Sequence, residues 1–245
     1  MSDPLLRIEK LGKRFGGFVA LEDIDLDVAP GERLGLIGPN GSGKSTLVNC
    51  ISGTLRNESG IVRFDGRVIN GLPAYQRTRL GLARSFQLPR PFRSMTVREN
   101  LRIPLLYTVN ARAGAHLGEA QIVARSDELL QLVGLEAKAE RRPRDLTQIE
   151  MRKLELARAM AAEPKLLMAD EAMAGLSHSE VDDILALLRK LVDQGITIIL
   201  IEHIMRAVMS FSERLVVLVA GRKIADGPPQ EVISNPEVER AYLGE

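Results

Sequence analysis

The sequence predicts an α/β protein in which a sheet is covered by helices on both faces. Short apolar runs bounded by glycine and proline alternate with segments whose apolar residues recur at helical spacing. One of these runs leads directly into the glycine-rich segment GPNGSGKST at 38–46, which a helical segment follows. The length of 245 residues suits one large domain that carries a subdomain.

Six apolar runs are predicted to form strands. They lie at 5–8, 33–37, 60–64, 166–169, 197–201 and 214–219. The clearest helix is predicted over 179–193, where six apolar residues share one face: Val181, Ile184, Leu185, Leu188, Leu191 and Val192. Ser177 and Glu180 have the spacing of a capping box, and Gly195 is typical of a helix end.

The segment 88–140 differs from the rest of the chain. It has no strong strand run, it contains Pro89, Pro91 and Pro104, and it has a helical pattern near 120–133. We therefore expect an inserted helical subdomain in this part of the chain.

Charge and cysteine content exclude several classes of protein. Lys and Arg number 33 and Asp and Glu number 32, which gives a net charge of +1, and there is no Trp. A broad basic surface is not expected, so nucleic acid is not an expected partner. Cys50 is the only cysteine, which excludes an intrachain disulfide and a cysteine-rich metal site. We expect neither an export signal nor a membrane-spanning segment.

The strongest chemical signal is the match to G-x-x-x-x-G-K-[ST] between a predicted strand and a predicted helix. It comprises Gly38, Pro39, Asn40, Gly41, Ser42, Gly43, Lys44, Ser45 and Thr46. Gly41 and Gly43 let backbone N–H groups point at phosphate oxygens, and the helix N-terminus adds partial positive charge. Lys44 is expected to bridge the β- and γ-phosphates, and the Ser45 hydroxyl to bind Mg²⁺. A glycine-rich turn with an exposed lysine is the alternative, and the complete motif disfavours it.

A second signal is the apolar run that ends in Asp170 and Glu171. A strand here would place Asp170 at the carboxyl edge of the sheet, where it could hold Mg²⁺ through water. Glu171 would point the other way and could act as a general base on the attacking water. Two adjacent acids are often a solvated turn, so this pair gains its weight from the phosphate-binding motif.

With these motifs, the sequence resembles the ATP-binding-cassette (ABC) ATPases from about residue 6 to the C-terminus. The resemblance implies a P-loop fold with a RecA-like mixed sheet core, an N-terminal antiparallel β subdomain and an inserted helical subdomain. The nucleotide-binding core would comprise 1–87 and 160–245, and the helical subdomain with the signature segment 88–159. The implied ligands are ATP and Mg²⁺.

The resemblance also assigns roles to individual residues. Phe15 matches the aromatic residue that stacks on adenine, although a core phenylalanine is an equally good interpretation. Gln87 matches the lid glutamine that contacts Mg²⁺ and the attacking water. His203 matches the switch histidine that contacts the γ-phosphate, and AGLS at 174–177 matches a loop between paired cassettes.

The signature segment departs from the family pattern L-S-G-G-Q. Here it reads Leu146-Thr147-Gln148-Ile149-Glu150. Ile149 adds a branched side chain where close backbone approach is needed, and Glu150 adds a negative charge near a phosphate. Because this segment acts on the ATP of the partner cassette, we expect a heterodimer with one weaker site, with a homodimer left open. Ala172 replaces a common proline, which is expected to loosen the loop slightly.

Within this family, the sequence is similar to that of cassettes that import branched-chain and other hydrophobic amino acids, a group that includes urea and amide relatives. Such a chain would hydrolyse ATP at the cytoplasmic face of the membrane, bound to a second cassette and two permease subunits. A groove between Gln87 and the helical subdomain would receive a short permease helix, and a solute-binding protein outside the cell would supply the cargo. Two alternatives stay open, a soluble ABC ATPase that acts on DNA or ribosomes and a nucleotide-switched module of low turnover.

Overall fold

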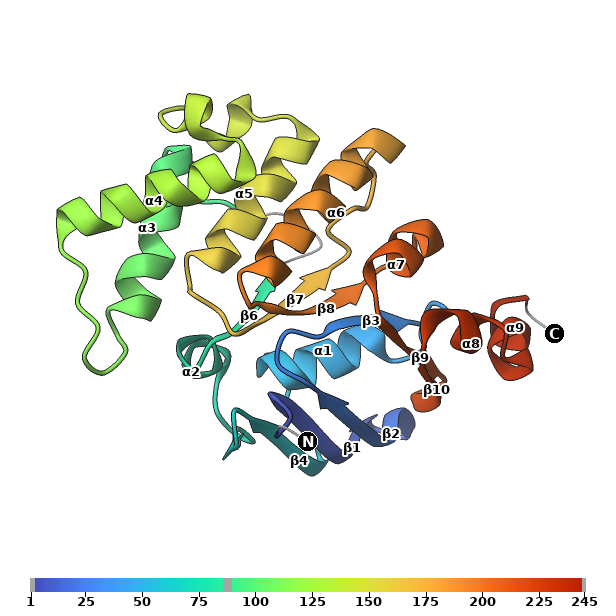
Figure 1. Ribbon diagram of the computed structural model, residues 1–245. Helices are drawn as coiled ribbons and strands as arrows, with labels where there is room; N and C mark the ends of the chain where they lie inside the picture. The colour runs from blue at the N-terminus through green and yellow to red at the C-terminus, as the bar shows by residue number, and fades with distance from the viewer. Residues whose placement is uncertain (1–2, 86–89, 244–245) are drawn as a thin grey trace.

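The computed structural model describes residues 3–85 and 90–243. Figure 1 shows two sheets, with α1 between them, and a layer of helices on the far face of the larger sheet. The expected α/β architecture and its mixed and antiparallel sheets are confirmed. No helix among the described residues has the length and apolar character needed to cross a bilayer.

The smaller sheet is antiparallel and has the strand order β2-β1-β4-β5. Its strands are β1 (Leu6–Phe15), β2 (Phe18–Val28), β4 (Ser59–Phe64) and β5 (Arg67–Val68). The first strand is longer than the predicted 5–8 because its pairing with β2 continues through several register shifts. These bulges interrupt the period-two pattern that marks a strand in the sequence.

The larger sheet has the order β10-β9-β3-β8-β7-β6, and only β10 runs antiparallel to its neighbour. Its strands are β3 (Arg33–Ile37), β6 (Leu82–Ser85), β7 (Leu166–Asp170), β8 (Thr197–Ile201), β9 (Arg214–Val219) and β10 (Arg222–Gly227). The four strands predicted for this sheet are confirmed. The carboxyl ends of β3, β7 and β8 therefore meet at one edge, where ligands bind in open α/β sheets.

Nine α-helices are assigned within the described residues. They are α1 (Lys44–Ser52), α2 (Ala74–Arg79), α3 (Val97–Pro104), α4 (Glu119–Val133), α5 (Gln148–Met160), α6 (His178–Asp193), α7 (Met205–Phe211), α8 (Pro229–Ile233) and α9 (Pro236–Leu243). Helix α6 has the predicted capping box, since the Ser177 hydroxyl accepts from the Glu180 amide and the Glu180 carboxylate accepts from the Ser177 amide. It ends just before Gly195, whose φ is +87°.

The faces of the larger sheet belong to two different hydrophobic cores. On β7, Leu167 and Ala169 pack with α5 and α6, whereas Leu166 and Met168 pack with α1 and the antiparallel sheet. Helices α3, α4 and α5 pack together at one end of the molecule (Figure 1). A short π-helix, η1 (Leu105–Val109), and two short 3-10 helices, η2 (Glu136–Lys138) and η3 (Pro143–Asp145), lie in the connections between them. This agrees with a helical insertion, and the boundaries of 88–159 stay a prediction.

Candidate functional site

A cavity of about 260 Å³ opens at the carboxyl edge of the larger sheet. Its lining comes from the β1–β2 hairpin, the loop before α1 and the ends of β7 and β8: Phe15, Phe18, Ala20, 40–46, Glu171 and His203. The fold therefore brings together most of the residues that the sequence motifs single out, although 188 positions separate Phe15 from His203.

The loop before α1 curls through glycine conformations that other residues rarely adopt. Gly38, Gly41 and Gly43 have φ of +152°, +77° and +104°. A Cβ at Gly38 would lie 2.1 Å from a backbone carbonyl of β9, so this position also requires close approach. The loop therefore wraps around the N-terminus of α1, where unpaired backbone N–H groups favour the binding of anions.

Lys44 lies inside this curl. Its Nζ donates to the carbonyl oxygens of Gly38, at 2.7 Å, and Pro39, at 3.0 Å. Burial lowers the pKa of Lys44, and the charges of Glu171 and Asp170 act in the opposite direction. The ammonium group is thus already positioned at the centre of the loop.

Asp170 ends β7 and is buried. Its Oδ2 accepts from Nη2 of Arg84 at 2.6 Å, and Nη1 of the same guanidinium donates to Oδ1 of Asn49 at 2.6 Å. Arg84 therefore joins β6, β7 and α1 beside the cavity. An isolated arginine carries no sequence signal, so its part in the site could not be predicted.

Glu171 and His203 face one another across the ends of β7 and β8. Oε1 of Glu171 lies 2.9 Å from Nε2 of His203. The Glu171 amide donates to the carbonyl of Ile201 at 2.9 Å, and Glu171 has a φ of +47°. A positive φ is uncommon for a residue with a side chain and marks a locally strained turn.

Phe15 is 49 % exposed and lies opposite Phe18 at the end of the β1–β2 hairpin. The Nζ of Lys13 lies 5.3 Å from the centre of the Phe15 ring. Phe15 is therefore not a core residue, and its ring borders the cavity. Gln87, the last of the predicted site residues, lies outside the described residues.

The signature segment begins α5 with a capping box. The Thr147 hydroxyl accepts from the Glu150 amide, and the Glu150 carboxylate accepts from the Thr147 amide and pairs with Nζ of Lys138 at 2.7 Å. These contacts hold the pKa of Glu150 below its usual value, the pairing with Lys138 contributing most. The expected negative charge is thus balanced within the chain, which the motif alone does not indicate. Gln148 reaches the carbonyl of Ala174, with Nε2 at 3.3 Å.

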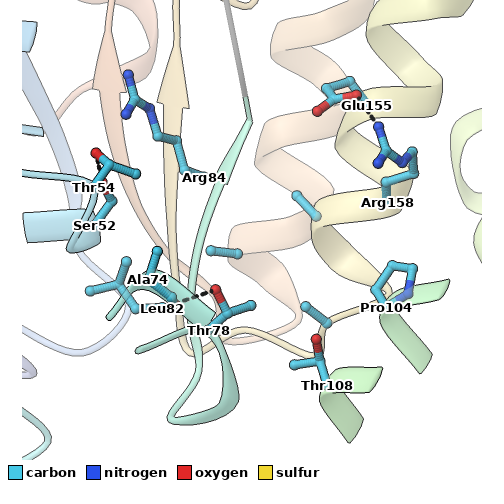
Figure 2. Close-up of a pocket in the computed structure, with 13 residues that line it drawn as sticks. Ser52, Thr54, Ala74, Thr78, Leu82, Arg84, Pro104, Thr108, Glu155 and Arg158 are labelled. Carbon is cyan, nitrogen blue, oxygen red and sulfur yellow. Dashed lines mark hydrogen bonds and ion pairs between the residues drawn. The ribbon is translucent and has the colours of Figure 1, made fainter. Parts of the chain in front are cut away.

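A second cavity, of about 200 Å³, separates α2 and β6 from η1 and α5. Figure 2 shows Arg84 on one side and the ion pair of Glu155 and Arg158 on the other. In this pair, Arg158 Nη1 donates to Glu155 Oε2 at 2.8 Å. Its lining residues come from the end of α1 and the turn after it, α2, β6, α3, η1, α5 and the turn after α5.

A phosphate-binding loop between a strand and a helix, with an acid at the end of a neighbouring strand, defines a P-loop nucleotide-binding protein. Residues 21–174 match the family model described as ABC transporter, and 222–245 match that of the branched-chain amino acid ATP-binding cassette transporter. The chain belongs to the ATP-binding cassettes of ABC transporters, a family of ATPases coupled to transport.

Relatives resemble the chain over its whole length. It is 39 % identical to the high-affinity branched-chain amino acid transport ATP-binding protein BraF of Pseudomonas aeruginosa, with all of both chains covered. It is 38 % identical to LivG of Escherichia coli K12, again over all of both chains. A solved ABC-transporter cassette in its ADP conformation aligns with a TM-score of 0.89 and 32 % identity over all of both chains. A dimeric cassette with ADP and Pi aligns at 0.80 and 27 %, covering 91 % of this chain and 98 % of the other.

Proposed function

We propose that this chain binds and hydrolyses ATP in an importer of branched-chain or other hydrophobic amino acids. The observation that carries the proposal is the single cavity shared by the phosphate-binding loop, Glu171 and His203. Such a cavity holds phosphates, a base and a charge-stabilising group within reach of one another.

Binding would rest on the curled loop 38–46 and on α1. Phosphate oxygens would accept from the loop amides and from Lys44, which would exchange its contacts with backbone carbonyls for the phosphates. Ser45 and Asp170 supply a hydroxyl and a carboxylate, the hard oxygen donors that suit Mg²⁺, with Gln87 as a third donor by family resemblance. Bound Mg²⁺ neutralises phosphate charge. The Phe15 ring would stack on the adenine.

Hydrolysis would use Glu171 as the general base. Its carboxylate borders the same cavity as Lys44 and is 19 % exposed, so it is accessible to water without being fully solvated. His203 orients Glu171 through their 2.9 Å contact and would donate to the γ-phosphate as charge develops there. Lys44 would stabilise the same charge from the loop side.

The cargo and the partners follow from the relatives. BraF and LivG are named for high-affinity branched-chain amino acid transport. We propose the same cargo class for this chain, with two permease subunits bound at the cytoplasmic face of the membrane. The cavity in Figure 2 would receive a permease helix, since apolar residues line it together with the charged residues Arg84, Glu155 and Arg158. A solute-binding protein would deliver the amino acid from outside.

The second cassette is proposed to be a different chain. Ile149 stands where the partner's ATP needs close backbone approach, and Gln148 replaces the preceding glycine of the family pattern. Because Lys138 balances Glu150, the weakness arises from side-chain bulk rather than from charge. The site built on the partner's phosphate-binding loop would then be the slower one. Equal ATP turnover at both sites of the reconstituted dimer would contradict this asymmetry.

Substitution of Glu171 by glutamine tests the hydrolytic site. Glu171→Gln keeps the shape of the side chain but removes the base, so ATP binding should persist while steady-state hydrolysis is lost. Binding is measured by calorimetry and turnover by phosphate release, with Asp183→Asn on the exposed face of α6 as the control. Retention of most of the turnover in Glu171→Gln would exclude Glu171 as the base.

A further inference from the structure

Glu202 is a buried acid that the proposed reaction does not use directly. It follows β8, stands next to His203 and is 2 % exposed. Buried carboxylates are rare unless they are paired or hydrogen-bonded, because burial disfavours the charged form. Burial raises the pKa of Glu202, while hydrogen bonds from the amides of Met173 and His203 lower it.

The contacts of Glu202 reach both loops of the hydrolytic site. Oε1 accepts from the Met173 amide at 2.8 Å, two residues after Glu171. The amide of His203 is its other backbone partner. One carboxylate therefore ties the turn that carries Glu171 to the turn that carries His203.

The opposite side of the same turn is held by α5. Nη2 of Arg152 donates to the carbonyl of Ala174 at 3.2 Å. Arg152 is itself buried, and the charge of Glu202 is the strongest of the acidic charges that favour its ionised form. The turn at 171–174 therefore has two side-chain contacts: Glu202 accepts from the Met173 amide, and Arg152 donates to the Ala174 carbonyl.

This turn needs such support because its geometry is strained. Glu171 has a φ of +47°, a conformation that persists only where the surroundings determine it. The bond from the Glu171 amide to the Ile201 carbonyl involves backbone only, so almost any sequence could provide it. The bond at Met173 depends on the side chain at position 202.

We propose that Glu202 is a positioning residue that holds Glu171 and His203 in their mutual geometry. The proposal rests on the proposed hydrolytic role of Glu171. Glu202 does not line the nucleotide cavity, so it acts through the two turns and not on ATP itself.

Kinetics of the full chain separate positioning from binding. Glu202→Ala should lower kcat by about 10- to 100-fold, because a small displacement of a catalytic group from its productive geometry slows the reaction strongly. The KM for ATP should stay unchanged, because Glu202 does not line the nucleotide cavity. Glu202→Gln keeps one acceptor oxygen for the Met173 amide and should give an intermediate kcat. A kcat for Glu202→Ala equal to that of the wild type would overturn the proposal, as would equal losses in Glu202→Gln and Glu202→Ala.

Glu32 provides a matched control. It is also a buried glutamate, it accepts from the Ala29 amide at 2.6 Å, and it pairs with Arg214 at 3.0 Å, away from the nucleotide cavity. Glu32→Ala should lower the unfolding midpoint without changing kcat. If Glu32→Ala lowers kcat as much as Glu202→Ala does, the effect is general destabilisation and the proposal fails.

Hydrogen exchange gives a readout that does not depend on catalysis. In Glu202→Ala, a peptide covering 171–177 should lose protection from hydrogen exchange, while a peptide from β8 should keep it. Unchanged protection at 171–177 would contradict the positioning role of Glu202. The comparison with Glu171→Gln separates the two proposals. Turnover by Glu171→Gln would refute the base assignment, whereas turnover lost in Glu171→Gln but retained in Glu202→Ala refutes only the role of Glu202.

Discussion

Phe15 shows how one exposed ring can acquire a function from its position. The ring lines the cavity that also contains the phosphate-binding loop. Half of its surface is exposed, so its contribution to folding is small. A stacking role is the simplest reason for an aromatic side chain at this place.

Replacement of Phe15 by alanine should therefore weaken ATP binding more than it weakens folding. Loss of stacking on a partly exposed ring is expected to cost about 1 kcal/mol, or about fivefold in Kd. Calorimetric titration with ATP and Mg²⁺ measures this change. Phe15→Tyr should retain the affinity, and Tyr75→Ala, which removes an exposed ring on α2, should not alter it. Equal affinity of Phe15→Ala and wild type would refute adenine stacking.

Helix α5 shows at the level of an element how a changed motif can keep its local structure. The family pattern is altered at four of five positions, yet Thr147 and Glu150 still close the first turn of the helix. The glutamate that first suggested repulsion of a phosphate serves as a cap and as the partner of Lys138. The helix is thus well formed even if its effect on a partner's nucleotide is altered.

Removal of the α5 cap should cause a measurable loss of stability. Thr147→Ala removes the side-chain acceptor for the Glu150 amide and should lower the free energy of unfolding by about 1 kcal/mol. Thr147→Ser keeps a hydroxyl and should stay close to the wild type. Denaturant unfolding followed by circular dichroism measures both variants. A Thr147→Ala chain as stable as the wild type would show that the cap contributes nothing.

Elements with strong local signals were predictable, and those that depend on distant partners were not. Local patterns predict β3, β7, β8 and α6, and the structure confirms these elements. The second half of strand β2 alternates between buried and exposed residues, a period-two pattern that its sequence shows. Strand β10 has no buried residue and so no apolar pattern. Arg84 and Glu202 act on residues 86 and 29 positions away, which no local pattern can indicate.

At the scale of the whole molecule, one cavity lies at the carboxyl ends of β7 and β8, and another lies beside the edge strand β6. One binds nucleotide in our proposal and the other receives the permease helix. We expect the chain to hydrolyse ATP several-fold faster in the assembled transporter than alone. The test reconstitutes it in proteoliposomes with a second cassette, two permease subunits and a leucine-loaded binding protein, and the vesicles should then accumulate leucine. Equal turnover with and without the permease would favour a soluble ATPase, and negligible turnover in both would favour a nucleotide switch.

An arginine introduced into the groove should separate basal ATP hydrolysis from its stimulation by the permease. Thr108→Arg, on η1, would obstruct the groove and should abolish stimulation by the permease while leaving the turnover of the isolated chain unchanged. Val123→Arg adds the same charge to an exposed part of α4 outside the groove and serves as the control. Full stimulation of Thr108→Arg would place the permease contact elsewhere.

Arg84 links the groove of Figure 2 to Asp170, the residue before Glu171 of the nucleotide cavity. It lines the groove of Figure 2, and its guanidinium pairs with the buried Asp170 carboxylate. A helix that moved Arg84 on entering the groove would change the charge balance at Asp170, and hence the affinity for a cation there. Linkage is reciprocal, so a cation bound at Asp170 would change the affinity for that helix by the same factor. In our proposal, Arg84 would therefore couple binding of the permease helix to binding of the cation.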